Sequence, residues 1–314
     1  MVLSTQNLHL GNANVNLRFK HGMVSPAYKT YDITGCSIEL LAHWIKSDAA
    51  KHFFYNATTV GASMCRRNVE WETLYEQPLF LPSPDEQDKI ASILSILAQR
   101  IDVQQKYVAA LKKYKRGLNH KLLSEIDEQY NRELGTVCSI VGGGTPDTLR
   151  PEYWEGNVEW FTPSEIGKSK YVLSSLRKIS QVGLSNSSAK SLPSGTVLLT
   201  TRATLGEMSI ARSECSTNQG FQSLVSDSKR VLPEYLYYLQ ILIKPWCEKY
   251  ASGNTFREIS KASLSKCVVP VPCLNSQKRI VCILSRIDEL IETHERVEDS
   301  LTQIKEGLLQ QLFI

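Results

Sequence analysis

The chain has 314 residues, a formal net charge of +4 and a hydrophobic content of 42%. This length permits two or more domains, the hydrophobic content is typical of a globular protein, and the charge permits but does not require a polyanionic partner. The eight cysteines are scattered without a Cys-x-x-Cys pair, which argues against a zinc site and a disulfide framework. No apolar stretch has the length of a membrane span and no signal peptide is recognisable, so we expect a cytoplasmic protein without a membrane partner.

Residues 1–80 contain short motifs that recur later in the chain. Arg67 and Val69 match Arg257 and Ile259 when 190 is subtracted from the later numbers. Residues 134 to about 200 have no counterpart in this first segment. We therefore expect residues 1–80 to form the distal portion of a globular domain whose complete copy comes later in the chain.

A long helix is predicted for residues 84–126, within a central spacer segment at 81–128. Its apolar residues alternate at steps of four and three, which is the spacing of a coiled-coil seam. Gln104 and Lys115 interrupt this seam, and polar residues at such positions weaken a coiled coil but fix its register. The seam consists of Ile90, Leu94, Leu97, Ile101, Leu111 and Leu118.

Residues 129–272 are predicted to form a compact α+β domain. Short β-rich runs alternate there with Gly, Pro and Ser, and the last third becomes helical from Pro233 onwards. The paired Trp154 and Trp160 are more typical of a domain core than of a base-stacking surface.

A second long helix, predicted for 274–314 within a segment at 273–314, repeats the first helix. Twelve identities occur between Pro82–Leu122 and Pro272–Leu312 without a gap. Its seam consists of Ile280, Leu284, Ile287, Ile291, Leu301 and Leu308. Two stripes of this period indicate a coiled coil between the helices, although an ordinary helical hairpin would also bury them. The duplication favours a rigid spacer, and a duplicated chain is expected to have a bipartite function.

These motifs together resemble the specificity (S) subunits of type I DNA restriction-modification enzymes. The resemblance is carried by Gly143–Pro146, by the run Tyr153–Trp160, by Thr217–Phe221 and by the repeated helices. It implies an α+β fold in which globular target-recognition domains are joined to two long antiparallel coiled-coil helices. Each domain would read one half of a split double-stranded DNA site.

The resemblance also implies partner proteins and an absence of catalysis in this chain. Specificity subunits recruit methyltransferase (modification) subunits and, for cleavage, restriction subunits with motor activity. DNA methylation with S-adenosylmethionine, and ATP with Mg²⁺, would therefore belong to the partners, and no cofactor or metal is expected here. The histidines form no His-Glu-x-x-His motif, and no phosphate-binding Gly-x-x-x-x-Gly-Lys-Ser/Thr motif follows the glycines at 142–144.

The chain departs from the family pattern because its first recognition domain lacks a front portion. A natural truncation, a split product that needs a complementing specificity fragment, and a half-length subunit that pairs with a second copy are all open interpretations. Two other functions also remain open: a helical-hairpin scaffold that joins proteins without touching DNA, and a degenerate specificity subunit without independent DNA recognition.

Eight polar residues are candidate DNA contacts under this resemblance. Cations suit phosphates, and amides suit adenine edges. Each residue also has a structural alternative, namely a solvated charge, a turn cap or an internal ion pair. The candidates are Thr145, Lys168, Lys170, Arg202, Asn218, Gln219, Arg257 and Arg67. Outside the seam, Tyr107, Tyr114 and Phe313 are candidate contacts with partner subunits, or else flank the seam.

Overall fold

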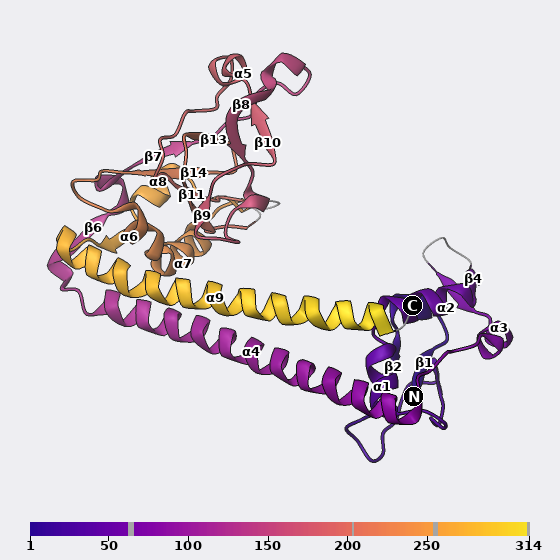
Figure 1. Ribbon diagram of the computed structural model, residues 1–314. Helices are drawn as coiled ribbons and strands as arrows, with labels where there is room; N and C mark the ends of the chain where they lie inside the picture. Colours follow the sequence, from indigo (N-terminus) through magenta and orange to yellow (C-terminus); the bar gives the residue numbers. More distant parts are fainter. Residues whose placement is uncertain (62–65, 203, 254–256, 313–314) are drawn as a thin grey trace. The chain divides into compact units, whose positions relative to one another are not determined.

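The computed structural model describes residues 1–61, 66–202, 204–253 and 257–312. The chain divides into two compact units: unit 1 is Met1–Ala110 with Leu290–Ile314, and unit 2 is Leu111–Glu289. Each unit combines a globular part with segments of both long helices, α4 (Pro84–Ser124) and α9 (Leu274–Leu312) (Figure 1). The two predicted helices are therefore confirmed. Among the described residues, no helix has the combination of length and apolar character needed to cross a bilayer.

The globular part of unit 2 is a mixed α+β structure, as predicted. Its strands are β6 (Asn131–Glu133), β7 (Cys138–Gly142), β8 (Trp154–Phe161), β9 (Tyr171–Val172), β10 (Arg177–Ile179), β11 (Val197–Leu199), β12 (Met208–Ala211), β13 (Cys215–Thr217), β14 (Gln222–Ser226) and β15 (Val268–Pro270). Its shorter helices are α5 (Gln181–Ser185), α6 (Pro233–Tyr238), α7 (Gln240–Tyr250) and α8 (Lys261–Ser265).

Two sheets organise this domain. The larger has the strand order β7-β14-β11-β12-β9, the smaller has the order β10-β8-β13, and β15 pairs with β6. Strands β9 and β12 run parallel, as do β8 and β13, so segments distant in the sequence become neighbours. One face of the larger sheet packs on α6 and α7 in a core that also includes Leu123 of α4 and Leu284 of α9. The domain is thereby fused to the helix segments of its own unit.

The globular part of unit 1 is smaller. It comprises β1 (Val2–Ser4), β2 (Ala13–Asn14), β3 (Tyr28–Thr30), α1 (Ile38–Trp44), α2 (Asp48–Asn56), β4 (Thr58–Val60), β5 (Arg67–Val69) and α3 (Trp71–Glu76). Strands β2-β1-β3 form one sheet and β4-β5 form a hairpin. Leu40 of α1 packs with Leu94 of α4 and Leu309 of α9, so this part is also attached to both helices.

The helix segments run antiparallel within each unit. In unit 1, Leu94 lies near Leu309, and further along α4 the Nε2 of Gln104 donates to the carbonyl oxygen of His294 at 2.9 Å. Gln104 is one of the polar residues that interrupt the first seam, and His294 is its equivalent in the repeat. All twelve predicted seam residues are buried or half-buried, as a seam requires. The pairing therefore buries a stripe that neither helix could cover alone.

The sequence at each helix entry fixes where the helix begins. The backbone N–H and the hydroxyl of Ser83 donate to the carboxylate of Glu86 at 3.0 and 2.7 Å, which caps the first turn of α4. These bonds lower the pKa of the Glu86 carboxyl group. Pro82 and Pro272 precede the two helices at equivalent positions and end the extended segments before them.

A buried glutamine joins each long helix to its globular part. Gln277 donates to the carbonyl oxygens of Pro272 and Arg230, both at 2.8 Å, and accepts from the backbone N–H of Leu232 at 2.9 Å. Its counterpart Gln87 donates to the carbonyl of Pro82 at 2.9 Å and accepts from the backbone N–H of Ser37 at 2.7 Å. Leu232 and Ser37 are the residues just before α6 and α1. The same side chain thus serves the same junction in both copies.

We predict that each glutamine protects the helix entry of its own unit. Gln277→Leu leaves buried donors and acceptors without partners, which costs about 1–3 kcal/mol for each such group. Hydrogen exchange should speed up at the Leu232 amide in Gln277→Leu and at the Ser37 amide in Gln87→Leu. Neither amide should respond in the control Gln99→Leu, because Gln99 is exposed on α4. Unchanged protection in both variants would contradict the anchoring role.

Candidate nucleic-acid interface

The two glycine-containing motifs of unit 2 cross each other at close range. A Cβ at Gly143 would lie 2.0 Å from the carbonyl oxygen of Asn218, so no larger residue fits there. The backbone N–H of Gly144 donates to the carbonyl of Thr217 at 2.8 Å, and the indole of Trp160 donates to the carbonyl of Gly144 at 2.9 Å. The glycines are needed for this backbone crossing, and the buried Trp160 supports it from the core.

Three of the predicted polar residues meet at this crossing. The hydroxyl of Thr145 donates to the Oε1 of the exposed Gln219. The Oδ1 of Asn218 accepts from the backbone N–H of Gly220 at 2.8 Å, which is the turn-capping role considered for it. The crossing therefore presents an amide and a hydroxyl at its surface, held by a backbone that cannot shift easily.

Arg202 lies beside the same crossing, and Arg257 directly precedes Glu258, the residue with which Arg202 pairs. The backbone N–H of Thr201 donates to the carbonyl of Gly220 at 2.8 Å, which brings Arg202 next to the Asn218 turn. The Nε of Arg202 donates to Glu258 at 2.9 Å, and its side chain is 43% exposed. The exposed Arg257 precedes Glu258 and donates to the carbonyl of Glu248. We call Thr145, Arg202, Asn218, Gln219 and Arg257 the junction ridge.

Lys168 lies on the loop that continues from Pro163, a residue beside the junction ridge. Pro163 packs against Gly220, where an added Cβ would lie 2.9 Å from its ring. Further along, the backbone N–H of Gly167, which has a φ of +86°, donates to the Oγ of Ser209 at 3.1 Å. Lys168 follows this turn and is exposed, so its ammonium group has the solvent access that a phosphate contact requires.

The placement of Lys170 does not fit the predicted DNA contact. Its side chain is 9% exposed, and its Nζ donates to Tyr238 at 2.8 Å and to Ser285 at 2.9 Å. Asp288 lies 3.8 Å away and accepts from the Tyr238 hydroxyl at 2.6 Å. The ammonium group is used inside the domain because an unpaired buried charge would be costly.

Lys170 belongs to a polar cluster between the domain and the helix segments of unit 2. Lys115 of α4 forms an ion pair with Asp288 of α9, so one carboxylate serves two lysines. Burial, with the hydrogen bond to Asp288, raises the pKa of the Tyr238 hydroxyl, which stays a donor. We call Lys115, Lys170, Tyr238, Ser285 and Asp288 the lysine socket.

Arg67 is also engaged within the protein, in the β4-β5 hairpin of unit 1. Its Nε and one terminal nitrogen donate to the hydroxyl and carbonyl of Thr58 at 2.8 and 2.6 Å. Its guanidinium lies 4.1 Å from the centre of the Tyr55 ring. This arrangement corresponds to the structural alternative considered for Arg67 rather than to a phosphate contact.

Several exposed groups near the front of the domain were not predicted from the sequence. Leu149 and Leu176 are 88% and 86% exposed, and Arg177 stacks on Trp154 with 3.8 Å to the ring centre. Trp154 and Trp160 pack edge to face at 5.2 Å between ring centres, and Trp160 is buried, which confirms the core interpretation for it. The two leucines belong to no periodic apolar pattern. The only feature of the sequence that could have indicated their exposure is their position in Pro- and Ser-rich turns.

The cysteines of the domain behave as small apolar residues. Burial raises the pKa of the thiols of Cys138, Cys215, Cys247 and Cys267 to about 12. Within the described ranges, no group of three or more His, Cys, Asp or Glu residues is placed to hold a metal ion. Cys65 lies outside the described residues, as does Phe313.

Comparisons with known proteins agree with the resemblance in the sequence. The chain is 32% identical over 187 residues to the type I restriction enzyme MjaIX specificity subunit of Methanocaldococcus jannaschii, which covers 58% of this chain and 43% of that protein. It is 26% identical over 258 residues to the EcoR124I/EcoR124II specificity subunit of Escherichia coli, covering 76% and 63%. The chain thus spans less than two thirds of the length of these relatives.

Solved structures share the fold. One, from work on complex assembly and conformational transition of the type I R-M system, has a TM-score of 0.58 at 23% identity and covers 88% of this chain and 71% of that one. The S subunit of a type I restriction-modification system from M. genitalium has a TM-score of 0.56 at 17% identity, covering 88% and 72%. Both support the α+β fold with long helices.

A family model described as the type I restriction modification DNA specificity domain matches residues 126–303, which is more than half of the chain. The match begins just after α4 ends, spans the junction ridge and all of the lysine socket except Lys115, and includes most of α9. The protein therefore belongs to this family of type I restriction-modification specificity domains.

Proposed function

We propose that this chain is the non-catalytic DNA-recognition subunit of a type I restriction-modification complex, and that residues 129–272 read a short DNA element through the junction ridge. The observation that carries this proposal is the convergence of the ridge. Thr145 comes from a segment more than fifty residues before Arg202 and Gln219, yet one backbone crossing brings the three residues together. Base reading needs such donors and acceptors on a rigid support.

A charged side chain of the junction ridge can exchange its partner within the protein for DNA. The side chains of the Arg202–Glu258 ion pair are 43% and 35% exposed, and ion pairs in contact with solvent contribute little to stability. Arg202 can therefore leave Glu258 for a guanine edge or a phosphate at low cost. Lys168 adds a cation on the adjoining loop. Lys170 and Arg67 are not part of this proposed surface because their charged groups are already bound within the protein.

The long helices carry a second apolar stripe that supports partner docking. Seven residues apart on α9, Leu290, Val297 and Ile304 are exposed, and Ile283 continues the spacing. On α4 the positions equivalent to Ile283, Val297 and Ile304 are Ile93, Tyr107 and Tyr114, which are also exposed, whereas the equivalent of Leu290 is Arg100. A seven-residue spacing is that of helix-on-helix packing. We propose that this outer stripe binds helical segments of the methyltransferase subunits, and that Tyr107 and Tyr114 belong to it.

The remaining chemistry is assigned to partners under this proposal. Methyl transfer from S-adenosylmethionine and ATP-Mg²⁺-dependent translocation belong to the modification and restriction subunits, and the complex acts on cytoplasmic DNA. Residues 1–80 are attached to both long helices through Leu40 of α1.

A protein-joining scaffold without DNA contact is the second candidate, because the outer stripe alone would suit it. The two candidates differ in what the junction ridge does. A complex that assembles through the helices but shows no ridge-dependent affinity for DNA would support the scaffold.

We predict that Arg202→Ala weakens binding of the cognate DNA by about 1–3 kcal/mol, the range of one specific base contact. The cognate site is first identified by methylome sequencing of cells with and without the gene. Affinity of the assembled methyltransferase complex for that duplex is then measured at physiological salt. The control is Arg230→Ala, because Arg230 also forms an ion pair with a carboxylate, that of Asp227, but lies at the helix entry. Equal affinities for the two variants would remove Arg202 from the reading surface.

We predict that Ile304→Asp prevents assembly with the methyltransferase subunits, because a charge would be buried in a helix interface. The neighbouring Gln303→Asp should leave assembly intact, since Gln303 is exposed and lies off the stripe. Size-exclusion chromatography with light scattering on co-expressed subunits gives the readout. Circular dichroism should show the same helix content in both variants. Normal assembly of Ile304→Asp would refute docking on the outer stripe.

A further inference from the structure

The lysine socket of unit 2 has a counterpart in unit 1. The hydroxyls of Tyr238 and Ser285 lie 3.1 Å apart in unit 2, and in unit 1 the Nε2 of His43 and the Oγ of Ser95 lie 3.1 Å apart. Ser95 and Ser285 are equivalent in the repeat, and His43 occupies on α1 the place that Tyr238 occupies on α6. Lys305 of α9 is likewise equivalent to Lys115 of α4. The same helix-to-domain contact is therefore built twice.

The helix-to-domain contacts of the two units differ in charge and in the size of the side chains that fill them. Asp288 forms ion pairs with both lysines of the lysine socket in unit 2, whereas the equivalent residue in unit 1 is Ala98. Lys170 enters the socket of unit 2 from the segment before β9, and this segment has no equivalent in residues 1–80. The bulky Tyr237 of α6 is matched by Ala42 of α1. Unit 1 thus has no carboxylate at position 98 and a small side chain at position 42.

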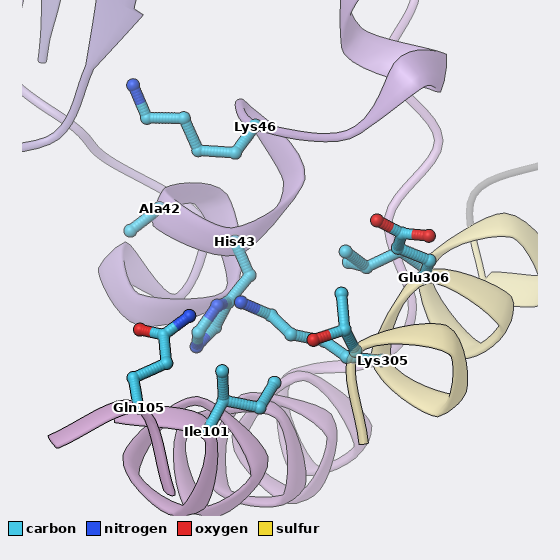
Figure 2. A pocket seen from close by; sticks show the side chains of 9 residues that line it. Ala42, His43, Lys46, Ile101, Gln105, Lys305 and Glu306 are labelled. Carbon is cyan, nitrogen blue, oxygen red and sulfur yellow. The ribbon is translucent and has the colours of Figure 1, made fainter. Parts of the chain in front are cut away.

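A pocket of about 280 Å³ lies beside this contact in unit 1 and is lined by His43 and Lys305, the counterparts of Tyr238 and Lys115. Its lining residues come from α1 or the turn after it, from α4 and from α9 (Figure 2), and the lysine socket is built on α6, α4 and α9, with α6 in the place of α1. They are Ala42, His43, Lys46, Ile101, Gln105, Thr302, Lys305, Glu306 and Leu309. The small side chain of Ala42, in the place of the bulky Tyr237, leaves part of this space open.

The floor of the pocket is cationic. Figure 2 shows the Lys305 ammonium beside the His43 ring, while the Glu306 carboxylate points away from that ring. Burial and the charge of Lys305 lower the pKa of the His43 ring, whereas Glu39 acts in the opposite direction. The Nζ of Lys46 is turned outward and donates to the carbonyl of Ala13 at 2.6 Å. An incoming group would thus meet Lys305 and His43 first.

We propose that this pocket is a charge-reversed socket that receives a glutamate or aspartate side chain from a second, different polypeptide, which takes the place that Lys170 takes in unit 2. A carboxylate would pair with Lys305 and accept from His43, and would replace the missing acid at position 98. A second copy of this chain does not fit as the donor of the equivalent segment, because that segment carries Lys170, which is buried in its own socket and has the same charge as Lys305. The proposal goes beyond DNA recognition and does not depend on it.

The test uses the full chain and observes His43 directly. The ring signals of His43 are followed by NMR during pH titration with millimolar N-acetyl-glutamate N-methylamide, and with the matching lysine compound. The glutamate probe should raise the pKa of His43 saturably, by about one unit, because a nearby opposite charge favours the protonated ring. The lysine probe should not raise it.

Three variants separate the proposed socket from a general anion effect. The response to glutamate should be lost in Lys305→Met and retained in Lys115→Met, which changes the equivalent lysine of unit 2. Ala98→Asp restores the acid of the other copy, so it should abolish the response to glutamate and confer binding of the lysine probe. Retention of the glutamate response in Lys305→Met, an equal response to both probes, or no saturable response would overturn the proposal. A dimer of this chain that Lys305→Met dissociates would overturn it in favour of a second copy.

Discussion

The structure depends on one constraint, which is that neither long helix can leave its apolar stripe in water. Helices of 41 and 39 residues with a polar majority gain little stability by themselves, and most of it must come from packing. Leu94 and Leu284 are fully buried, each within a core that also contains residues from a globular part. Helix pairing and domain attachment are therefore the same event in each unit, and the buried Gln87 and Gln277 fix its register.

The helical part of the fold was predictable because its signals are local and repeated. Seam spacing, the proline before each helix and twelve identities all point to the same pair of helices. The sheets were predictable only as α+β character. Strand β9 pairs with β12 and β8 with β13 across intervals of more than thirty residues, and such pairings leave no mark in a short window of sequence. The division into two units that each contain parts of both helices also depends on these long-range contacts.

The candidate site was predictable where backbone geometry demanded a residue type. The glycines at 143 and 144 and the Asn218 turn were identified from sequence, and the structure brings them to one crossing. Charged residues predicted the candidate site less well than the glycines did, because the sequence does not show which lysine pairs with a carboxylate inside the protein. Lys170 and Lys168 are two residues apart, yet one is buried against Asp288 and the other is exposed. The identity of Gln87 and Gln277 in the repeat was visible, but only the structure gives its reason.

The glycine crossing also has an evolutionary consequence. Where two backbones approach so closely, almost every substitution is eliminated by steric clash, so Gly143 and Gly144 are effectively frozen. The turn tips that carry Leu149 and Leu176 bear no such restriction, since their side chains extend into solvent. Substitutions in these turns would alter the surface chemistry without disturbing the backbone crossing of the domain. A domain organised in this way can acquire new targets through a few point changes while its architecture persists.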